Sequence, residues 1–163
     1  MAFAIEVTDP QPGCSVLVIG SGTEAGAFAA RVGPDVEVRV SENLADAAGD
    51  NLADAAGDNL ADAAGDNLAG AAGDNLAGAA GASDLVCAFG IPEFRDSDVS
   101  RLAGIPELLL PAGQLWVFDS PGEDDSAGSL SMRISTTLSH AGLAIVDILE
   151  GRCVIGLCAM VKG

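Results

Sequence analysis

The sequence predicts an α/β protein built on a mostly parallel β-sheet. Short apolar runs alternate with segments of helical composition along the 163 residues. A glycine-rich turn joins the first apolar run directly to the first helical segment. The last two apolar runs are joined by residues 150–152 alone, and so short a connection produces an antiparallel hairpin. We therefore expect helices on both faces of the sheet and an antiparallel β-hairpin at the C-terminal end.

The individual elements follow from their residue patterns. The first strand is apolar throughout after its opening serine, which is typical of a buried parallel strand, and the second alternates with period two. The first helix is rich in small residues and ends at Gly33-Pro34, whereas the second is interrupted by Gly104 and Pro106. We expect strands at 15–19, 36–40, 84–89, 115–119, 144–149 and 153–161, and helices at 25–32, 97–109 and 127–141.

Residues 42–81 form five octapeptide copies, from ENLADAAG to DNLAGAAG, and contain no Lys or Arg. An octad advances a helix by about 800°, so each leucine is displaced by about 80° around the axis from the preceding one. Each copy also contains a glycine, which costs a helix interior about 1 kcal/mol. We expect a helix in the first copy or two, followed by a loosely packed helical or looped insertion. The chain is then one domain, 1–163, with the repeat inserted at 42–81.

The chain is strongly acidic, with 24 Asp and Glu against 7 Lys and Arg and a net charge of −17. The repeat supplies eight of these charges, which leaves −9 on the other 123 residues. Such a chain repels nucleic acid unless a partner intervenes. Abundant Asp and a single lysine favour solubility in concentrated salt. We therefore expect a protein of a halophile or of a high-GC organism, the alternative being an ordinary acidic cytosolic protein.

No long apolar segment or secretory signal is visible. The longest apolar stretches, such as 157–161, fall far short of the roughly 20 residues that span a membrane. The first residues lack a basic region followed by a long apolar one. We therefore expect a cytoplasmic protein without membrane contact.

The four cysteines do not form a metal-binding pattern. They contain no C-x-x-C pair, and His140 is the single histidine, so we expect no metal site. Because Cys87, Cys153 and Cys158 lie within apolar runs, we expect them to be buried free thiols.

The turn Gly20-Ser21-Gly22 lies between a predicted buried strand and a predicted helix. Glycines let a ligand approach the backbone closely, and the start of a helix offers unpaired N–H groups. Glu42 follows Gly22 by 20 residues, at the end of the second strand, where a carboxylate can accept hydrogen bonds from ribose hydroxyls. The pattern indicates a nucleotide-containing cofactor. A glycine turn without a ligand remains an alternative, and Gly20-x-Gly22-x-x-Ala25 also satisfies the NAD(P)-binding fingerprint.

Five segments carry a resemblance to a known family: VLVIGSGTEAGAFAARV at 16–32, DVEVRVSENLADAA at 35–48, DLVCAFGIPEF at 84–94, LLLPAGQLWVFDSP at 108–121, and the last helix with the C-terminal hairpin at 138–163. Residues 14–42 together with 84–163, 109 of the 163 residues, resemble class I S-adenosylmethionine-dependent methyltransferases. The resemblance implies a Rossmann-like fold, S-adenosylmethionine as cofactor, and methyl transfer to an unidentified acceptor. It leaves the catalytic residues unidentified, and its implied cofactor-binding residues are Gly20, Ser21, Gly22, Glu42, Phe89 and Gly90.

The sequence also departs from that family. Val18 stands where the family has an acidic residue, and the repeat occupies the place of the family's third strand. The loop at 91–94 reads Ile-Pro-Glu-Phe and lacks the Asn or Asp that accepts a hydrogen bond from an amine substrate. A non-catalytic, degenerate Rossmann-like protein that acts in interactions is therefore an alternative. Asp119 lies at the predicted carboxyl end of a strand, where α/β proteins bind ligands.

Overall fold

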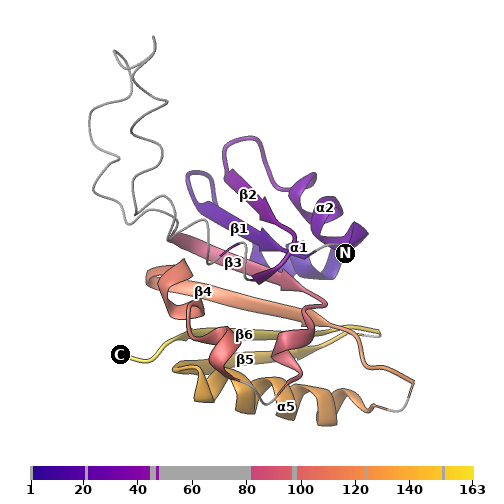
Figure 1. The fold of residues 1–163 in the computed structure, drawn as a ribbon. Helices are drawn as coiled ribbons and strands as arrows, with labels where there is room; N and C mark the ends of the chain where they lie inside the picture. Colours follow the sequence, from indigo (N-terminus) through magenta and orange to yellow (C-terminus); the bar gives the residue numbers. More distant parts are fainter. Residues whose placement is uncertain are drawn as a thin grey trace.

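The computed structural model describes residues 2–20, 22–44, 47, 82–96, 99–123, 125–151 and 153–163. Six strands form one sheet in the order β2-β1-β3-β4-β6-β5 (Figure 1). The first four strands in this order are parallel, and β6 runs antiparallel to both β4 and β5. The predicted fold class is therefore confirmed. The strands are β1 (Ser15–Ile19), β2 (Glu37–Ser41), β3 (Ser83–Phe89), β4 (Leu109–Asp119), β5 (Leu143–Glu150) and β6 (Ile155–Val161).

Helices cover both faces of this sheet, as predicted. Because successive side chains of a strand point to opposite faces, the buried strand residues divide into two apolar clusters. The cluster on one face includes residues of α1 (Ala2–Thr8) and α2 (Thr23–Ala29). The cluster on the other face includes residues of α5 (Ala127–His140) and of three short 3₁₀ helices, Pro92–Phe94, Val99–Leu102 and Ile105–Leu108.

The structure corrects the helix predicted at 97–109. Its described part consists of two separate 3₁₀ helices, and the last predicted residue, Leu109, already belongs to β4. Pro106 lacks a backbone N–H, and Gly104 disfavours a continuous helix, so the segment breaks into single turns. The N-terminal helix α1 was not predicted, because its seven residues are too few for a clear periodic pattern.

Strand β4 also begins earlier than the predicted residue 115. Ser83 of β3 pairs with Leu109, but Leu85 pairs with Gln114, so β4 contains a bulge between these two pairings. Ala112 has a positive φ of 68° within this bulge, which matches the turn expected at Pro111-Ala-Gly113. The turn therefore interrupts the strand without ending it.

The repeat lies almost entirely outside the described residues. Of its 40 positions, 42–44 and 47 are described, and here Leu44 and Ala47 are buried in the core on the α5 face of the sheet. The Ala47 N–H donates to the Asn43 carbonyl oxygen at 3.2 Å. The helix expected in the first copy or two, and the insertion expected after it, otherwise fall on residues that are not described. Among the described residues, strand β2 pairs with β1.

Candidate functional site

The turn after β1 requires glycine at position 20. Gly20 has a φ of +151°, and a Cβ atom there would lie 2.9 Å from the backbone carbonyl oxygen of Phe89 at the end of β3. Its N–H donates to the Ser41 carbonyl oxygen at the end of β2, at 2.9 Å. The ends of three parallel strands thus converge on Gly20, and a side chain at this position would push β1 away from β3.

Gly22 is the residue before the first turn of α2, with an extended backbone (φ −88°, ψ 170°). A Cβ atom on Gly22 would lie 2.7 Å from Oε2 of Glu24, so the Glu24 side chain bends back over the turn. Sequence reasoning did not single out Glu24. Ser21, between the two glycines, lies outside the described residues.

Glu42 follows β2 directly and is exposed. The register pairs Ile19 with Ser41, so Gly20 and Glu42 are the next residues at the same edge of the sheet. The strand register is therefore consistent with a Glu42 carboxylate that lies near the glycine turn, as the interpretation of Glu42 as a ribose ligand requires. Glu42 is not among the described residues that line a cavity there.

Phe89 and Gly90 lie on the other side of the turn, at the end of β3. The Phe89 ring stacks on Phe118 with centroids 5.1 Å apart and contacts Phe28 of α2 at 5.4 Å. Gly90 has a φ of +60° and donates its N–H to the Phe118 carbonyl oxygen at 2.9 Å. The chain leaves the sheet at this glycine.

Two adjoining cavities open between these residues, with volumes of about 270 and 230 Å³. They share five lining residues and together form the edge cleft. The cleft lies at the carboxyl ends of β3 and β4, beside the turn that follows β1. Its lining residues are Ala4, Gly22, Glu24, Phe89, Gly90, Phe118, Asp119, Ser120, Cys153 and Val154.

Asp119, which lines the cleft, forms an ion pair with Arg95, which is not among the cleft's lining residues. The Asp119 side chain is 2% exposed, and both of its carboxylate oxygens accept hydrogen bonds from the Arg95 guanidinium, one of them from Nε at 2.7 Å. The Ser120 N–H also donates to Asp119, at 2.8 Å. Hydrogen bonding to Asp119 raises the pKa of Arg95. Asp119 is thus at the strand end where it was expected, but its charge is balanced by Arg95, which sequence reasoning had not identified.

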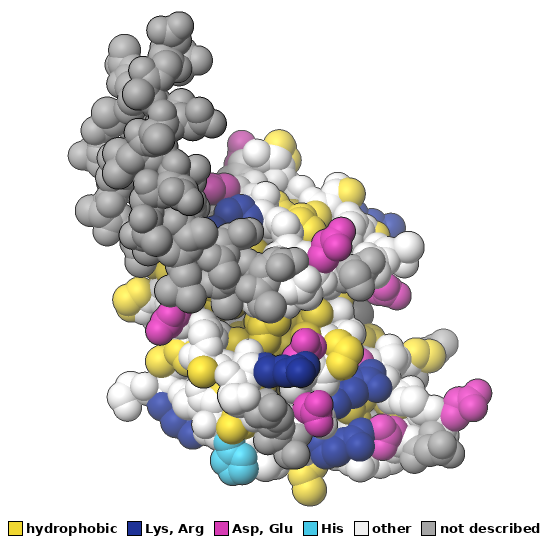
Figure 2. All heavy atoms as spheres, viewed as in Figure 1, with side chains coloured by type: hydrophobic (Ala, Val, Ile, Leu, Met, Phe, Trp, Pro, Cys, Tyr) yellow, Lys and Arg dark blue, Asp and Glu magenta, His cyan; other side chains and the backbone are white. Residues whose placement is uncertain are grey.

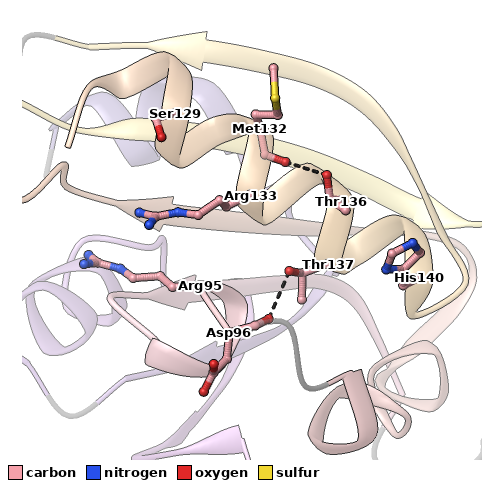
Figure 3. A pocket seen from close by; sticks show the side chains of 8 residues that line it. All are labelled: Arg95, Asp96, Ser129, Met132, Arg133, Thr136, Thr137 and His140. Atoms are coloured by element: carbon pink, nitrogen blue, oxygen red, sulfur yellow. Dashed lines mark hydrogen bonds between the residues drawn. The ribbon is translucent and has the colours of Figure 1, made fainter.

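A larger cavity, of about 520 Å³, lies along α5 (Figure 3). Arg95 and Arg133 extend along it, and His140 lies at its other end. Both arginines have carboxylate partners, Asp119 and Asp125, and Asp96 adds a further negative charge. The cavity is therefore not electropositive, although it contains two of the chain's seven basic residues. Figure 2 likewise shows Lys and Arg side chains lying beside Asp and Glu on the visible face.

The cysteines follow the sequence prediction with one exception. Cys87 and Cys158 are buried, whereas Cys153 is exposed at the edge cleft. The prediction of a buried Cys153 is wrong because the residue precedes β6 and lies in the loop that leads into it. Within the described ranges, no group of three or more His, Cys, Asp or Glu side chains could hold a metal ion. Nor does any helix in that part of the chain have the length and apolar character to span a membrane.

No protein-family model matches the sequence, and no curated protein is significantly similar to it. Solved structures of similar fold include a SAM-dependent methyltransferase from Aquifex aeolicus, with a TM-score of 0.61 and 15% identity over 99% of this chain and 89% of that one. The mitomycin 7-O-methyltransferase MmcR gives 0.56 and 17%, over 99% of this chain and 53% of its own. The ribosomal protein L11 methylase from Lactobacillus delbrueckii subsp. bulgaricus gives 0.52 and 21%, over 99% and 77%. At these identities the likeness is one of architecture, and the chain has the Rossmann-like fold of S-adenosylmethionine-dependent methyltransferases.

Proposed function

We propose that this protein binds S-adenosylmethionine in the edge cleft and transfers its methyl group to an acceptor that is not yet identified. The observation that carries the proposal is the position of the cleft. From β1 the chain continues to β2 on one side of β1 and then to β3 on the other side. The direction in which successive strands are added therefore reverses between β1 and β3. Open α/β sheets bind ligands outside the carboxyl ends of their strands at such a point.

The residues assigned to the cofactor are those that surround this point. The turn Gly20-Ser21-Gly22 gives the ligand access to the backbone, and Phe89 and Gly90 border the cleft on the β3 side. Glu42 accepts hydrogen bonds from the ribose hydroxyls. Of these residues, Gly22, Phe89 and Gly90 line the cleft, Gly20 and Glu42 lie beside it along the edge, and Ser21 is assigned from the sequence alone.

The chain's own groups have a modest chemical role in this scheme. S-adenosylmethionine supplies an electrophilic methyl group when it is bound. A nucleophile held in line with that group reacts mainly because it is positioned, with little need for an acid or base. The aromatic and aliphatic cleft residues Phe89, Phe118 and Val154 exclude water from the ligand. No side chain is assigned a catalytic role.

Calorimetric titration with S-adenosylmethionine, S-adenosylhomocysteine and NAD, in low and in molar salt, tests the proposal. Micromolar binding of the first two without NAD is the expected result. The site variant is Gly22→Val, because Gly22 lines the cleft and the one close contact of a new Cβ atom would be with the flexible end of Glu24, at 2.7 Å. Gly33→Val is the matched control, since a Cβ atom at Gly33 meets nothing within 4 Å.

We expect Gly22→Val to abolish binding and Gly33→Val to preserve it. Binding of NAD alone would favour the dinucleotide-binding alternative. If none of the three ligands binds to protein that circular dichroism shows to be folded, the proposal fails and the non-catalytic alternative stands.

A further inference from the structure

Strand β5 forms one end of the sheet and carries exposed apolar side chains. It is the last strand in the sheet order, and among the described residues it pairs with β6 alone (Figure 1). Val146 and Ile148 of this strand are 58% and 44% exposed. A strand at the end of a sheet offers backbone N–H and C=O groups to which a further strand can bind.

The strand register identifies the backbone groups of β5 that are open to such a strand. The Gly151 N–H donates to the Val154 carbonyl oxygen at 2.8 Å, and the same register continues back along β5 as far as Asp147. Because bonded and non-bonded pairs alternate along an antiparallel ladder, the N–H and C=O groups of Ile148 and Glu150 point away from β6. The Ile148 N–H accordingly donates to Oδ1 of Asp147, at 2.8 Å, and not to β6.

The segment 147–150 reads acidic-apolar-apolar-acidic, from Asp147 to Glu150. Both acidic residues are exposed, and strand β5 contains no Lys or Arg. The ion pairs found among the described residues include neither Asp147 nor Glu150. Opposite charges on facing residues of paired strands stabilise the pairing, so these carboxylates favour a strand with a basic residue opposite each of them.

A second copy of this chain is a poor partner for the same segment. Two copies paired along β5 would bring acidic strands together, and each chain has a net charge of −17. Strand β5 also has a register shift between Ile145 and Asp147, which interrupts the strand just before the segment. Charges and bulges at a sheet edge oppose pairing with an identical strand, whereas a basic segment gains from the same charges.

We propose that residues 147–150 bind an extended basic segment of a partner protein, which joins the sheet as a further strand beside β5. Opposite these residues the partner segment reads basic-apolar-apolar-basic, a pattern that is the same in either chain direction. Its backbone bonds to the outward groups of Ile148 and Glu150, and its basic side chains pair with Asp147 and Glu150. None of these residues lines the edge cleft, so the inference does not rest on the proposed function.

The probe is the synthetic peptide acetyl-Thr-Lys-Val-Val-Lys-Thr-amide, added at low ionic strength to the isotopically labelled full chain and followed by NMR. At saturation we expect amide hydrogen exchange to slow about fivefold or more at Ile148 and Glu150, because their N–H groups become bonded to the peptide. At Leu149 we expect a change of less than about twofold, because its N–H already bonds to β6.

Two control peptides separate strand addition from general attraction to an acidic protein. One has glutamates in place of the lysines, and the other has both valines methylated at the backbone nitrogen. Since successive N–H groups of a strand point to opposite sides, one of the two valine N–H groups faces β5 in either orientation. Methylation therefore blocks the pairing and keeps the charge. We expect neither control peptide to slow exchange at Ile148 or Glu150.

A double variant, Asp147→Asn with Glu150→Gln, tests the two charges. Asp35→Asn with Glu37→Gln is the matched control, because both residues are exposed and lie at the start of β2 or just before it, at the opposite end of the sheet. We expect the first pair to weaken binding of the lysine peptide about three- to tenfold and the control pair to leave it within about twofold.

Three results would overturn the inference. The first is slowed exchange with the methylated peptide as well, or no slowing at Ile148 and Glu150 with the lysine peptide. The second is equal weakening by the two double variants. The third is a dimer in sedimentation velocity whose Ile148 and Glu150 amides are already protected in the free protein, which would assign the segment to a second copy. S-adenosylmethionine takes no part in these measurements, so their outcome is separate from that of the proposed function.

Discussion

Replacement of Gly20 by alanine probes the backbone geometry on which the candidate site depends. The φ of +151° is rarely adopted by residues with a side chain, and such strain costs about 1–3 kcal/mol. The added Cβ would also lie 2.9 Å from the Phe89 carbonyl oxygen. This oxygen belongs to the β-sheet backbone and cannot move without disturbing the β1–β3 pairing. We expect Gly20→Ala to lower the free energy of unfolding by about 2–4 kcal/mol in total.

Two other glycines provide the controls for this substitution. The one close contact of a Cβ atom at Gly22 is with the flexible end of the Glu24 side chain, its other neighbours being at 3.9 Å, and a Cβ atom at Gly33 meets nothing within 4 Å. We expect Gly22→Ala and Gly33→Ala to change the free energy of unfolding by less than about 1 kcal/mol. Urea denaturation followed by the fluorescence of Trp116 gives all three values, because this single tryptophan is 5% exposed and stacks on Phe118. A loss in Gly20→Ala no larger than that in Gly33→Ala would refute the reasoning.

Three further predictions concern side chains. Arg95→Ala leaves the buried Asp119 carboxylate with the Ser120 N–H as its remaining described donor, so the free energy of unfolding measured in urea should fall by about 2–3 kcal/mol. Arg133→Ala should lower it by less than about 1 kcal/mol, because the partner Asp125 is more exposed. Equal losses in the two variants would contradict this prediction. At pH 8 we expect thiol reagents to modify the exposed Cys153 and to leave Cys158 and Cys87 unmodified. Burial raises the pKa of Cys158 to about 11, and it raises the pKa of Cys87 as well. Mass spectrometry that shows Cys158 modified as fast as Cys153 would contradict this. Hydrogen bonds from Ser15 lower the pKa of Asp84 below its ordinary 3.8, so its stabilisation is fully present above that pH and is lost as the pH falls through the folded-state pKa. Asp84→Asn should accordingly destabilise by less than about 1 kcal/mol at pH 7 and by progressively less in acid, and a loss that stayed constant down to pH 2 would argue against that assignment.

Much of the fold follows from local patterns in the sequence. The apolar run at Ser15–Ile19 predicts a central strand because it is buried on both faces, and the short 150–152 connection requires an antiparallel hairpin. The element boundaries were less predictable. The end of β2 and the start of β6 differ from the predicted limits by one or two residues, and the early start of β4 depends on a bulge that pairs Leu85 with Gln114. Such a bulge is determined by contacts with β3 and leaves no periodic signal in β4 itself.

The candidate site was predictable only where the backbone determines it. The backbone at Gly20 requires glycine, with a φ of +151° and a close approach to Phe89, whereas Gly22 has an ordinary extended backbone and was indicated by its spacing from Gly20. Glu24 and Arg95 were missed, since their significance depends on distant groups: Glu24 on the shape of the cleft, and Arg95 on Asp119, which lies 24 residues away in the sequence. No local spacing rule connects such partners. Cys153 was misjudged for a related reason, because an apolar neighbourhood in sequence does not distinguish a strand from the loop before it.

Mapping the binding site of S-adenosylmethionine by NMR tests the central claim most directly. The account predicts amide shifts that concentrate at Gly22, Phe89 and Gly90, with residues of the α5 cavity such as Ser129 and Thr136 unaffected. Shifts centred on the α5 cavity, or no shifts at millimolar cofactor, would contradict the placement of the cofactor in the edge cleft.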